Sequence, residues 1–156
     1  MRLDRTWLQS HIPHHGRMCL LDEVVEWDER HIRCRSGSHL AADHPLRSRG
    51  RLGIASGIEY AAQAMAAHSA LSAAAWASGS AAAQARPAAG YLAGLRDVRM
   101  YVQRLDDLES DLVCDAALIA GDARAALYEF ALTCEGRRLL SGRATVVFDA
   151  EERLNR

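Results

Sequence analysis

The sequence contains no lysine, because all nineteen of its Lys and Arg residues are arginine. This absence excludes a Schiff base, a lysine nucleophile and a Walker-type phosphate-binding loop, since each of these needs a lysine amine. The formal net charge of −1 gives no indication of binding to nucleic acid or to an anionic membrane. The first residues contain no apolar signal core, and the longest apolar stretch is interrupted by Glu59, Gln63 and His68. We therefore expect neither a signal peptide nor a membrane span.

Cysteine is scarce, and the four cysteines are scattered along the chain at Cys19, Cys34, Cys114 and Cys134. No C-x-x-C pair and no histidine at zinc-ligand spacing accompanies them, so we expect no metal site. The last three fall in predicted strands, where buried small hydrophobic side chains are the favoured interpretation. A reducing cytoplasm is the expected location.

The pattern of apolar residues predicts a hairpin, then a helix. Residues 1–18 are expected to form a short helix or turn followed by a loop, and residues 19–27 and 31–35 to form two paired strands. Residues 39–53 contain Pro45, Gly50 and Gly53, which favour a loop. One long helix is predicted over 54–77, because the run is apolar on nearly every face and is therefore buried on several sides.

The second half of the chain is predicted to be extended. Residues 78–90 are a low-complexity stretch of Ala, Gly, Ser and Pro that we expect to be a mobile connection. Four strand-like segments follow, at roughly 91–102, 110–120, 124–135 and 138–148. The order of hairpin, long helix and antiparallel meander predicts a single α+β domain over residues 1–156, with one buried helix wrapped by a sheet.

An acidic residue, Glu59, lies at the front of the long helix among apolar neighbours. Burial of a carboxylate as an ion is costly, so we expect the pKa of Glu59 to be raised towards neutrality, as a general acid or base requires. A capping box with Ser56 is the structural alternative. Gln63 lies one turn further on the same face, where it either orients the carboxylate or satisfies a buried backbone group. His68 is expected to face a partner subunit or solvent.

Three blocks, in order, resemble the β-hydroxyacyl-acyl-carrier-protein dehydratases of fatty-acid synthesis, and most closely their divergent relatives in bacterial aryl-polyene clusters. Residues 13–22 (PHHGRMCLLD) are similar to the Pro-His…Leu-Val-Asp start of these enzymes. Residues 59–63 (EYAAQ) are similar to their helix segment, in which an acid is followed four positions later by Gln. Residues 93–99 (AGLRDVR) resemble the strand after the helix. The likeness spans most of the chain and implies a hotdog fold.

These dehydratases carry a catalytic histidine in a Gly-His-Phe-Pro loop before the helix. The corresponding stretch here is residues 42–46 (ADHPL), in which His44 matches the histidine while Gly and Phe are absent. The interval from His44 to Glu59 is also one residue longer than in the family. A Gly53-Ile54 pair stands where the family has the Pro-Gly that opens its helix.

The resemblance implies reversible loss of water from a 3-hydroxyacyl thioester, without a metal or other cofactor. His44 would remove the α-proton and Glu59 would assist departure of the β-hydroxyl. His14 competes with His44 for the catalytic role. Its alternative roles are to border the substrate channel or to hold the N-terminal loop by a structural hydrogen bond. Backbone amides at the start of the helix would hold the thioester oxygen. The expected substrate-binding residues are Gly53, Ile54, Gly57 and Gln63.

The expected partners are an acyl carrier protein or coenzyme A thioester and a second subunit. One curved sheet would not cover an all-round apolar helix, so we expect a homodimer or higher oligomer. In the resembling family the histidine of one subunit faces the acid of the other. Two alternatives stay open: a non-catalytic hotdog subunit that assembles with an active partner, and an acyl thioesterase whose helix carboxylate activates water.

Overall fold

The computed structural model describes residues 2–77 and 90–148 of the chain. Two helices and six strands make up these residues: α1 (Arg5–His11), β1 (Glu23–Trp27), β2 (His31–Ser36), α2 (Gly57–Ala77), β3 (Gly90–Met100), β4 (Leu112–Gly121), β5 (Ala125–Cys134) and β6 (Arg137–Phe148). Short 3-10 turns lie at Gly16–Met18, Ser38–Leu40 and Ile54–Ser56.

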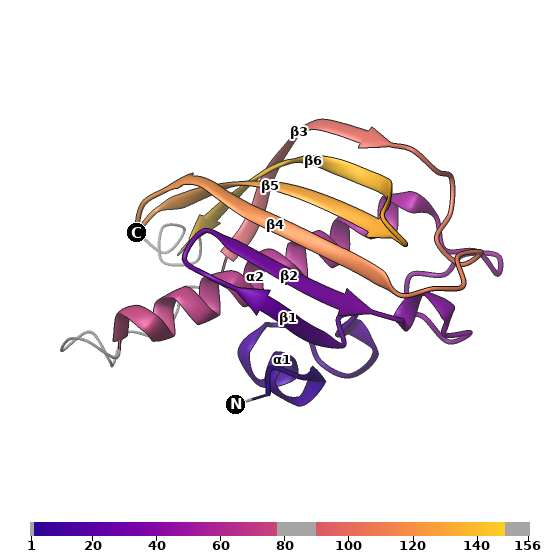
Figure 1. Cartoon of the computed structure of the whole chain (residues 1–156), viewed down its shortest axis with the longest axis horizontal. Coiled ribbons are helices and arrows are strands. Elements are labelled where there is room, and N and C mark those ends of the chain that lie inside the picture. The colour runs from indigo at the N-terminus through magenta and orange to yellow at the C-terminus, as the bar shows by residue number, and fades with distance from the viewer. Residues whose placement is uncertain (1, 78–89, 149–156) are drawn as a thin grey trace, which may run out of the picture.

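The six strands form one antiparallel sheet in the order β1-β2-β4-β5-β6-β3. Figure 1 shows this sheet arching over α2, with α1 beside β1. The chain between β2 and β4, which are neighbours in the sheet, includes α2 and β3. Strand β3 lies at the opposite edge of the sheet from β1, next to β6. The α+β architecture predicted from the sequence is confirmed.

Alternation of burial along the central strands places the core between the sheet and α2. Along β5, buried and less buried residues alternate from Ala126 to Cys134, so one face of the strand meets the helix. Gly57 lies at the point of closest approach, because a Cβ atom there would be 2.9 Å from the Cδ2 atoms of both Leu132 and Leu140. Glycine at this position therefore lets the helix begin directly against the sheet.

The element boundaries correct the sequence prediction in three places. The first strand begins at Glu23 rather than residue 19, although Cys19, Leu20 and Leu21 are fully buried. The predicted helix over 54–77 starts with a 3-10 turn and becomes α-helical at Gly57. Residues 78–89 of the predicted connection lie outside the described residues, and residue 90 is the first residue of β3.

The four cysteines are buried free thiols, which confirms the interpretation of Cys34, Cys114 and Cys134 as small core residues. Burial raises the pKa of the Cys34 thiol to about 12, so this group is un-ionised at neutral pH. No helix among residues 2–77 and 90–148 is long and apolar enough to cross a membrane.

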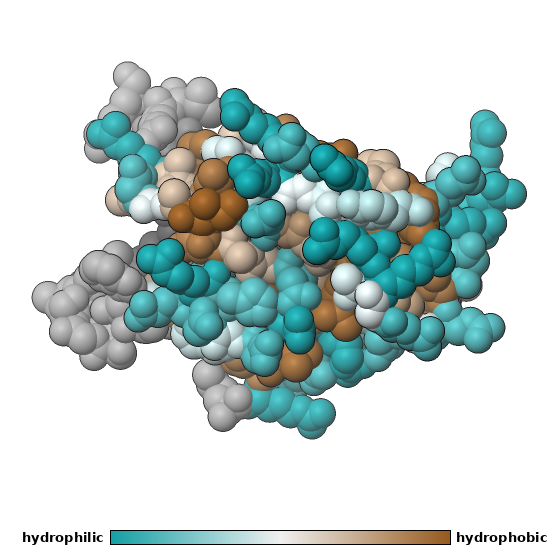
Figure 2. Space-filling view, turned by 45° about the horizontal axis from the view of Figure 1, so that its top comes forward, coloured by the Kyte–Doolittle hydropathy of each residue, from teal (hydrophilic) through white to brown (hydrophobic). Residues whose placement is uncertain are grey.

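Apolar side chains also reach the surface. Figure 2 shows a face that is mostly hydrophilic, with separate hydrophobic patches between the polar side chains. The edge strand β3 is exposed along most of its length. In and beside it are five large hydrophobic residues that are each at least 38% exposed: Tyr91, Leu92, Leu95, Met100 and Tyr101.

Candidate active site

The structure brings His14 and Glu59 together at the start of α2. His14 belongs to the loop after α1, and Glu59 lies in the first turn of α2. The distance from His14 Nε2 to Glu59 Oε1 is 2.8 Å, and the two side chains are 23% and 33% exposed, respectively. A half-buried imidazole in contact with a carboxylate is the kind of pair that carries general acid–base chemistry, because both groups are ionisable and reachable.

Gln63 attaches the loop that carries His14 to the helix that carries Glu59. Its side chain is fully buried. Its Oε1 accepts from the Leu20 N–H at 2.8 Å, and its Nε2 donates to the Met18 carbonyl at 2.7 Å. The same Nε2 lies 3.5 Å from Glu59 Oε1. Gln63 therefore fulfils both sequence-based interpretations at once, since it satisfies buried backbone groups and holds the carboxylate.

The pKa of Glu59 is lowered, which corrects the expectation from the sequence. The hydrogen bond from His14 is the largest cause and outweighs the opposing effect of burial, with a further contribution from Gln63. The sequence shows the apolar neighbours on the helix but not the loop that returns to this carboxylate. In the described part of the chain Glu59 makes no hydrogen bond to Ser56, so the alternative of a capping box is not observed.

The two ring nitrogens of His14 have different surroundings. Nε2 faces Glu59, and Nδ1 is buried without a hydrogen-bond partner among the described residues. The lowered pKa keeps Glu59 ionised at neutral pH, so its carboxylate accepts a hydrogen bond from the N–H group at Nε2 of His14. The contact is an ion pair whenever the imidazole is protonated.

His44 lies elsewhere and is already engaged. It is 5% exposed, its Nδ1 accepts from the Leu46 N–H at 3.1 Å, and its Nε2 lies 3.0 Å from the Tyr60 hydroxyl. Since a backbone N–H donates to Nδ1, the proton of the neutral ring is on Nε2 and points to Tyr60. Burial, and next the charge of Arg47, lower the pKa of His44. None of its described contacts reaches Glu59.

Tyr60 and Ser38 join His44 to the same loop, and sequence reasoning missed both. The Tyr60 hydroxyl lies 2.7 Å from Ser38 Oγ, which donates to the Leu20 carbonyl at 2.7 Å. Burial raises the pKa of Tyr60 to about 12, so it remains a neutral link. A buried tyrosine directly after the acidic residue was the signal available in the sequence, because a buried hydroxyl needs a partner.

The backbone amides at the start of the helix are largely occupied. The Ile54 N–H donates to the Gln103 carbonyl at 3.0 Å, and the Gly57 N–H donates to the carbonyls of Ala55 and Ile54. Gly53 is exposed. Of these three predicted substrate-binding positions, two therefore already use their amides within the chain.

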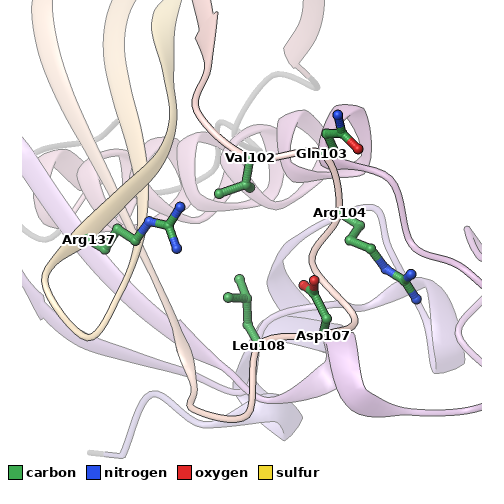
Figure 3. Close-up of a pocket in the computed structure, with 6 residues that line it drawn as sticks. All are labelled: Val102, Gln103, Arg104, Asp107, Leu108 and Arg137. Carbon is green, nitrogen blue, oxygen red and sulfur yellow. The ribbon is translucent and has the colours of Figure 1, made fainter.

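A surface hollow of about 270 Å³ adjoins this segment through Gln103. Figure 3 shows Arg137 reaching from the β5–β6 turn towards Val102 and Leu108. The guanidinium of Arg104 turns away from the hollow and is held by the carboxylate of Asp106. Asp107 also lines the hollow.

His68 is buried, with 1% of its surface exposed, rather than facing a partner or solvent as expected. Its Nδ1 lies 2.8 Å from the Tyr128 hydroxyl, and its Nε2 donates to the Asp28 carbonyl at 2.9 Å. Burial is the largest cause that lowers the pKa of His68, so the ring is neutral. His68 therefore joins α2 to Tyr128 on β5 and to the turn after β1.

Comparison with known proteins agrees with this fold. The model of the ApeP-like family, described as ApeP dehydratase, matches residues 7–155. No curated protein matches the chain.

Among solved structures, the dehydratase heterocomplex ApeI:P from Xenorhabdus doucetiae is similar, with a TM-score of 0.79 and 24% identity over 95% of this chain and 94% of that chain. A mutant thioesterase from Pseudomonas aeruginosa matches with a TM-score of 0.56 and 12% identity over 80% and 78%. A hypothetical thioesterase with coenzyme A from Streptococcus pneumoniae matches with a TM-score of 0.57 and 9% identity over 81% and 84%. At these identities the structures show the fold, and they confirm the hotdog fold.

Proposed function

This chain belongs to the ApeP-like dehydratase family, and from that premise we propose that it removes water reversibly from a 3-hydroxyacyl thioester of acyl carrier protein. The observation that carries the proposal is the 2.8 Å contact between His14 Nε2 and Glu59 Oε1. Both groups lie on one chain and are partly exposed, so a substrate can reach the pair. No other histidine of the described residues contacts Glu59.

Glu59 is the base in this proposal. Its lowered pKa keeps the carboxylate ionised at neutral pH, which suits it to accept the α-proton of the substrate rather than to donate a proton. This reverses the role expected from the sequence. Oε1 is held by His14 and Gln63, so Oε2 is the oxygen left to meet the substrate.

Protonated His14 is the acid. Glu59 takes the proton from the α-carbon through Oε2, the electron pair of the broken C–H bond forms the double bond, the bond to the β-oxygen breaks, and the hydroxyl leaves as water with the proton of His14 Nε2. Glu59 is then protonated and His14 neutral. The 2.8 Å contact returns the proton from Glu59 to His14, so the pair is restored without an outside proton carrier.

The carrier is proposed from the resemblance and from the hollow beside the start of the helix. Arg137 lines this hollow and forms no ion pair among the described residues. An arginine in such a position can bind the phosphate of a phosphopantetheine arm through charge-assisted hydrogen bonds.

We further propose that the chain assembles with a second hotdog subunit through β3. This strand is the edge of the sheet, is eleven residues long and exposes large hydrophobic side chains. An exposed apolar edge strand promotes uncontrolled association unless another chain covers it. The similar ApeI:P structure is named a heterocomplex, which favours a different hotdog subunit over a second copy.

The test is hydration of an enoyl thioester, followed by loss of the ultraviolet absorbance of the conjugated thioester. Glu59→Gln and His14→Ala should each lower kcat by ~10²–10⁴-fold. His15→Ala is the matched control, because His15 is the exposed neighbour of His14. Full activity in Glu59→Gln would exclude the carboxylate as the base, and loss only in His44→Ala would return the chemistry to the loop at residues 42–46.

An ionised carboxylate that can activate water also fits thioester hydrolysis, the activity named for two structural neighbours. A thiol reagent distinguishes the two reactions, because hydrolysis releases a free thiol and hydration does not. Absence of both reactions in the wild-type protein would favour a non-catalytic subunit.

A further inference from the structure

The loop that carries His14 begins at the end of α1 and returns to the start of the same helix. At the end of α1, the Ile12 N–H donates to the Leu8 carbonyl at 2.9 Å. Further along the loop, the Gly16 carbonyl accepts a hydrogen bond from Arg5 Nη2 at 2.8 Å. Since Arg5 is the first residue of α1, this bond closes the loop against the helix, and His14 lies between the two attached ends.

Helix α1 is a fixed support for this arginine. The Leu8 side chain is fully buried and Trp7 is 8% exposed, so one face of the short helix belongs to the core. The Asp4 side chain caps the first turn by accepting from the Trp7 N–H at 3.1 Å. Just before the helix, the Val24 N–H donates to the Leu3 carbonyl at 2.8 Å, which attaches this part of the chain to β1. A guanidinium that extends from such a helix can define the position of a loop.

The guanidinium of Arg5 also reaches the far end of the loop. Its Nη1 lies 3.7 Å from Asp22 Oδ1, and the other oxygen of this carboxylate accepts from the Gly37 N–H at 2.7 Å. Asp22 directly precedes β1 and Gly37 directly follows β2, so the carboxylate is held at the sheet. Arg5 therefore connects α1, the middle of the His14 loop and the end of that loop at the sheet.

The two halves of the loop are attached to different helices. Gln63 on α2 bonds to backbone groups of the second half. In the first half, the 3-10 turn at Gly16–Met18 is closed by backbone hydrogen bonds that stay within the loop. The bond from Arg5 attaches this half to α1. His14 reaches Glu59 from the first half, so the place of its imidazole depends on this attachment.

We infer that Arg5 is a positioning residue for the active-site pair, because it holds the loop where Nε2 of His14 meets Glu59. The inference rests on the proposed function and adds a residue on α1 to it. Among residues 2–77 and 90–148, Arg5 contacts neither member of the pair, so it acts through the backbone at Gly16. Its side chain is 39% exposed, so its loss should affect stability much less than activity.

Direct binding of the substrate is the competing role for an exposed arginine. The kinetic constants separate the two roles. A positioning role predicts a lower kcat with KM nearly unchanged, because the acid is displaced while the substrate still binds. A substrate-binding role predicts a raised KM. A purely structural role predicts a loss of activity that follows the loss of thermal stability.

The experiment compares Arg5→Met, Arg5→Lys and Arg2→Met with the wild-type protein in the hydration of a crotonyl thioester. Arg5→Met keeps an apolar stem without a donor and should lower kcat about 10–100-fold. Its melting temperature should stay within about 4 °C of wild type. Arg5→Lys retains one donor group and should recover part of the lost kcat. Arg2→Met is the control, since Arg2 is exposed and bonds to none of the residues that the structure describes.

A double-mutant cycle tests whether Arg5 acts through His14. In a His14→Ala protein, Arg5→Met should lower the residual rate less than about twofold, because the group that it positions is already gone. A further loss as large as in the wild-type background would overturn the inference. It would also be overturned by an unchanged kcat in Arg5→Met, by a raised KM with kcat intact, or by loss of activity and thermal stability together.

A chemical measurement keeps the inference separate from the proposed function. Neither ring nitrogen of His14 is open to a reagent, because Nε2 bonds to Glu59 and Nδ1 is buried. Diethyl pyrocarbonate should therefore modify His14 more slowly than the exposed His15, as fragment mass spectrometry resolves. Arg5→Met should increase the rate at His14 several-fold, and Arg2→Met should not.

The two proposals can then fail independently. If the wild-type protein hydrates no enoyl thioester but Arg5→Met exposes His14 to the reagent, the dehydratase proposal fails and the positioning role stands. If the wild-type protein is active and Arg5→Met changes neither kcat nor the reactivity of His14, the positioning role fails and the dehydratase proposal stands.

Discussion

Replacement of Gln63 by leucine should both destabilise the protein and disable the active-site pair. Leucine has a volume close to that of glutamine, so the change creates no large cavity. It removes the acceptor of the Leu20 N–H and the donor to the Met18 carbonyl. The loop that carries His14 would then be held to α2 by fewer contacts, because the contact of the Gln63 amide with Glu59 is lost as well.

The size of the effect follows from the burial of these groups. Leu20 is fully buried, so its orphaned N–H costs about 1–3 kcal/mol. Met18 is 38% exposed, so its carbonyl can meet water and the loss there is about 0.5–1.5 kcal/mol. Together they amount to about 1.5–4.5 kcal/mol, which should lower the urea midpoint by about 1–2 M. A displacement of His14 by about 1 Å would lower the rate of hydration by ~10²-fold.

Urea unfolding followed by circular dichroism measures the first effect, and enoyl-thioester hydration the second. All variants need the same protein concentration, because assembly contributes to apparent stability. Gln9→Leu is the control, since Gln9 on α1 is half-buried and bonds to none of these groups. A Gln63→Leu protein within about 0.5 kcal/mol of wild type, with full activity, would refute the role assigned to this amide.

Three further predictions test the fold and the site. Gly57→Ala should destabilise the protein by about 1–3 kcal/mol in urea, because the new methyl group meets two leucine side chains; a neutral result would contradict the close approach. His44→Phe should cost about 1–3 kcal/mol, because it removes the hydrogen bond to Tyr60 and the acceptor of the Leu46 N–H, and leave hydration nearly intact; the reverse outcome would make His44 the catalytic histidine. The lowered folded-state pKa of Glu59 means that unfolded chains bind its proton first as pH falls below the ordinary value of 4.5. Wild type should therefore lose stability relative to Glu59→Gln in that range, and a pH-independent difference between them would argue against the His14 contact.

The fold was predictable because its signals are local. The continuous apolar run of α2 predicts a buried helix, and the period-two alternation of β5 predicts a strand with one buried face. Both patterns are visible within a short stretch of sequence. The apolar pattern of Cys19 to Leu21 predicts a strand. In the structure the Leu20 amide pairs with the Gln63 side chain instead of a neighbouring strand. Because this hydrogen bond joins residues far apart in the sequence, no local sequence pattern predicts it.

The site was predictable in its residue types and not in their pairing. Glu59, His14, His44 and Gln63 could each be singled out, and the structure joins His14 to Glu59 and His44 to Tyr60. The resemblance favoured His44 by its place in the loop. Which histidine reaches the carboxylate depends on where two loops pack, and that position also determines the sign of the Glu59 pKa shift.

The location of His14 and Glu59 on a single chain has a consequence for stoichiometry and for genetics. A site divided between subunits can be rebuilt by mixing two differently inactivated chains, since one of the mixed interfaces has both intact partners. Here each chain carries its own pair, so His14→Ala and Glu59→Gln chains should fail to complement one another when they are co-expressed. The number of working sites in any assembly should then equal the number of intact copies of this chain, whatever subunit covers β3.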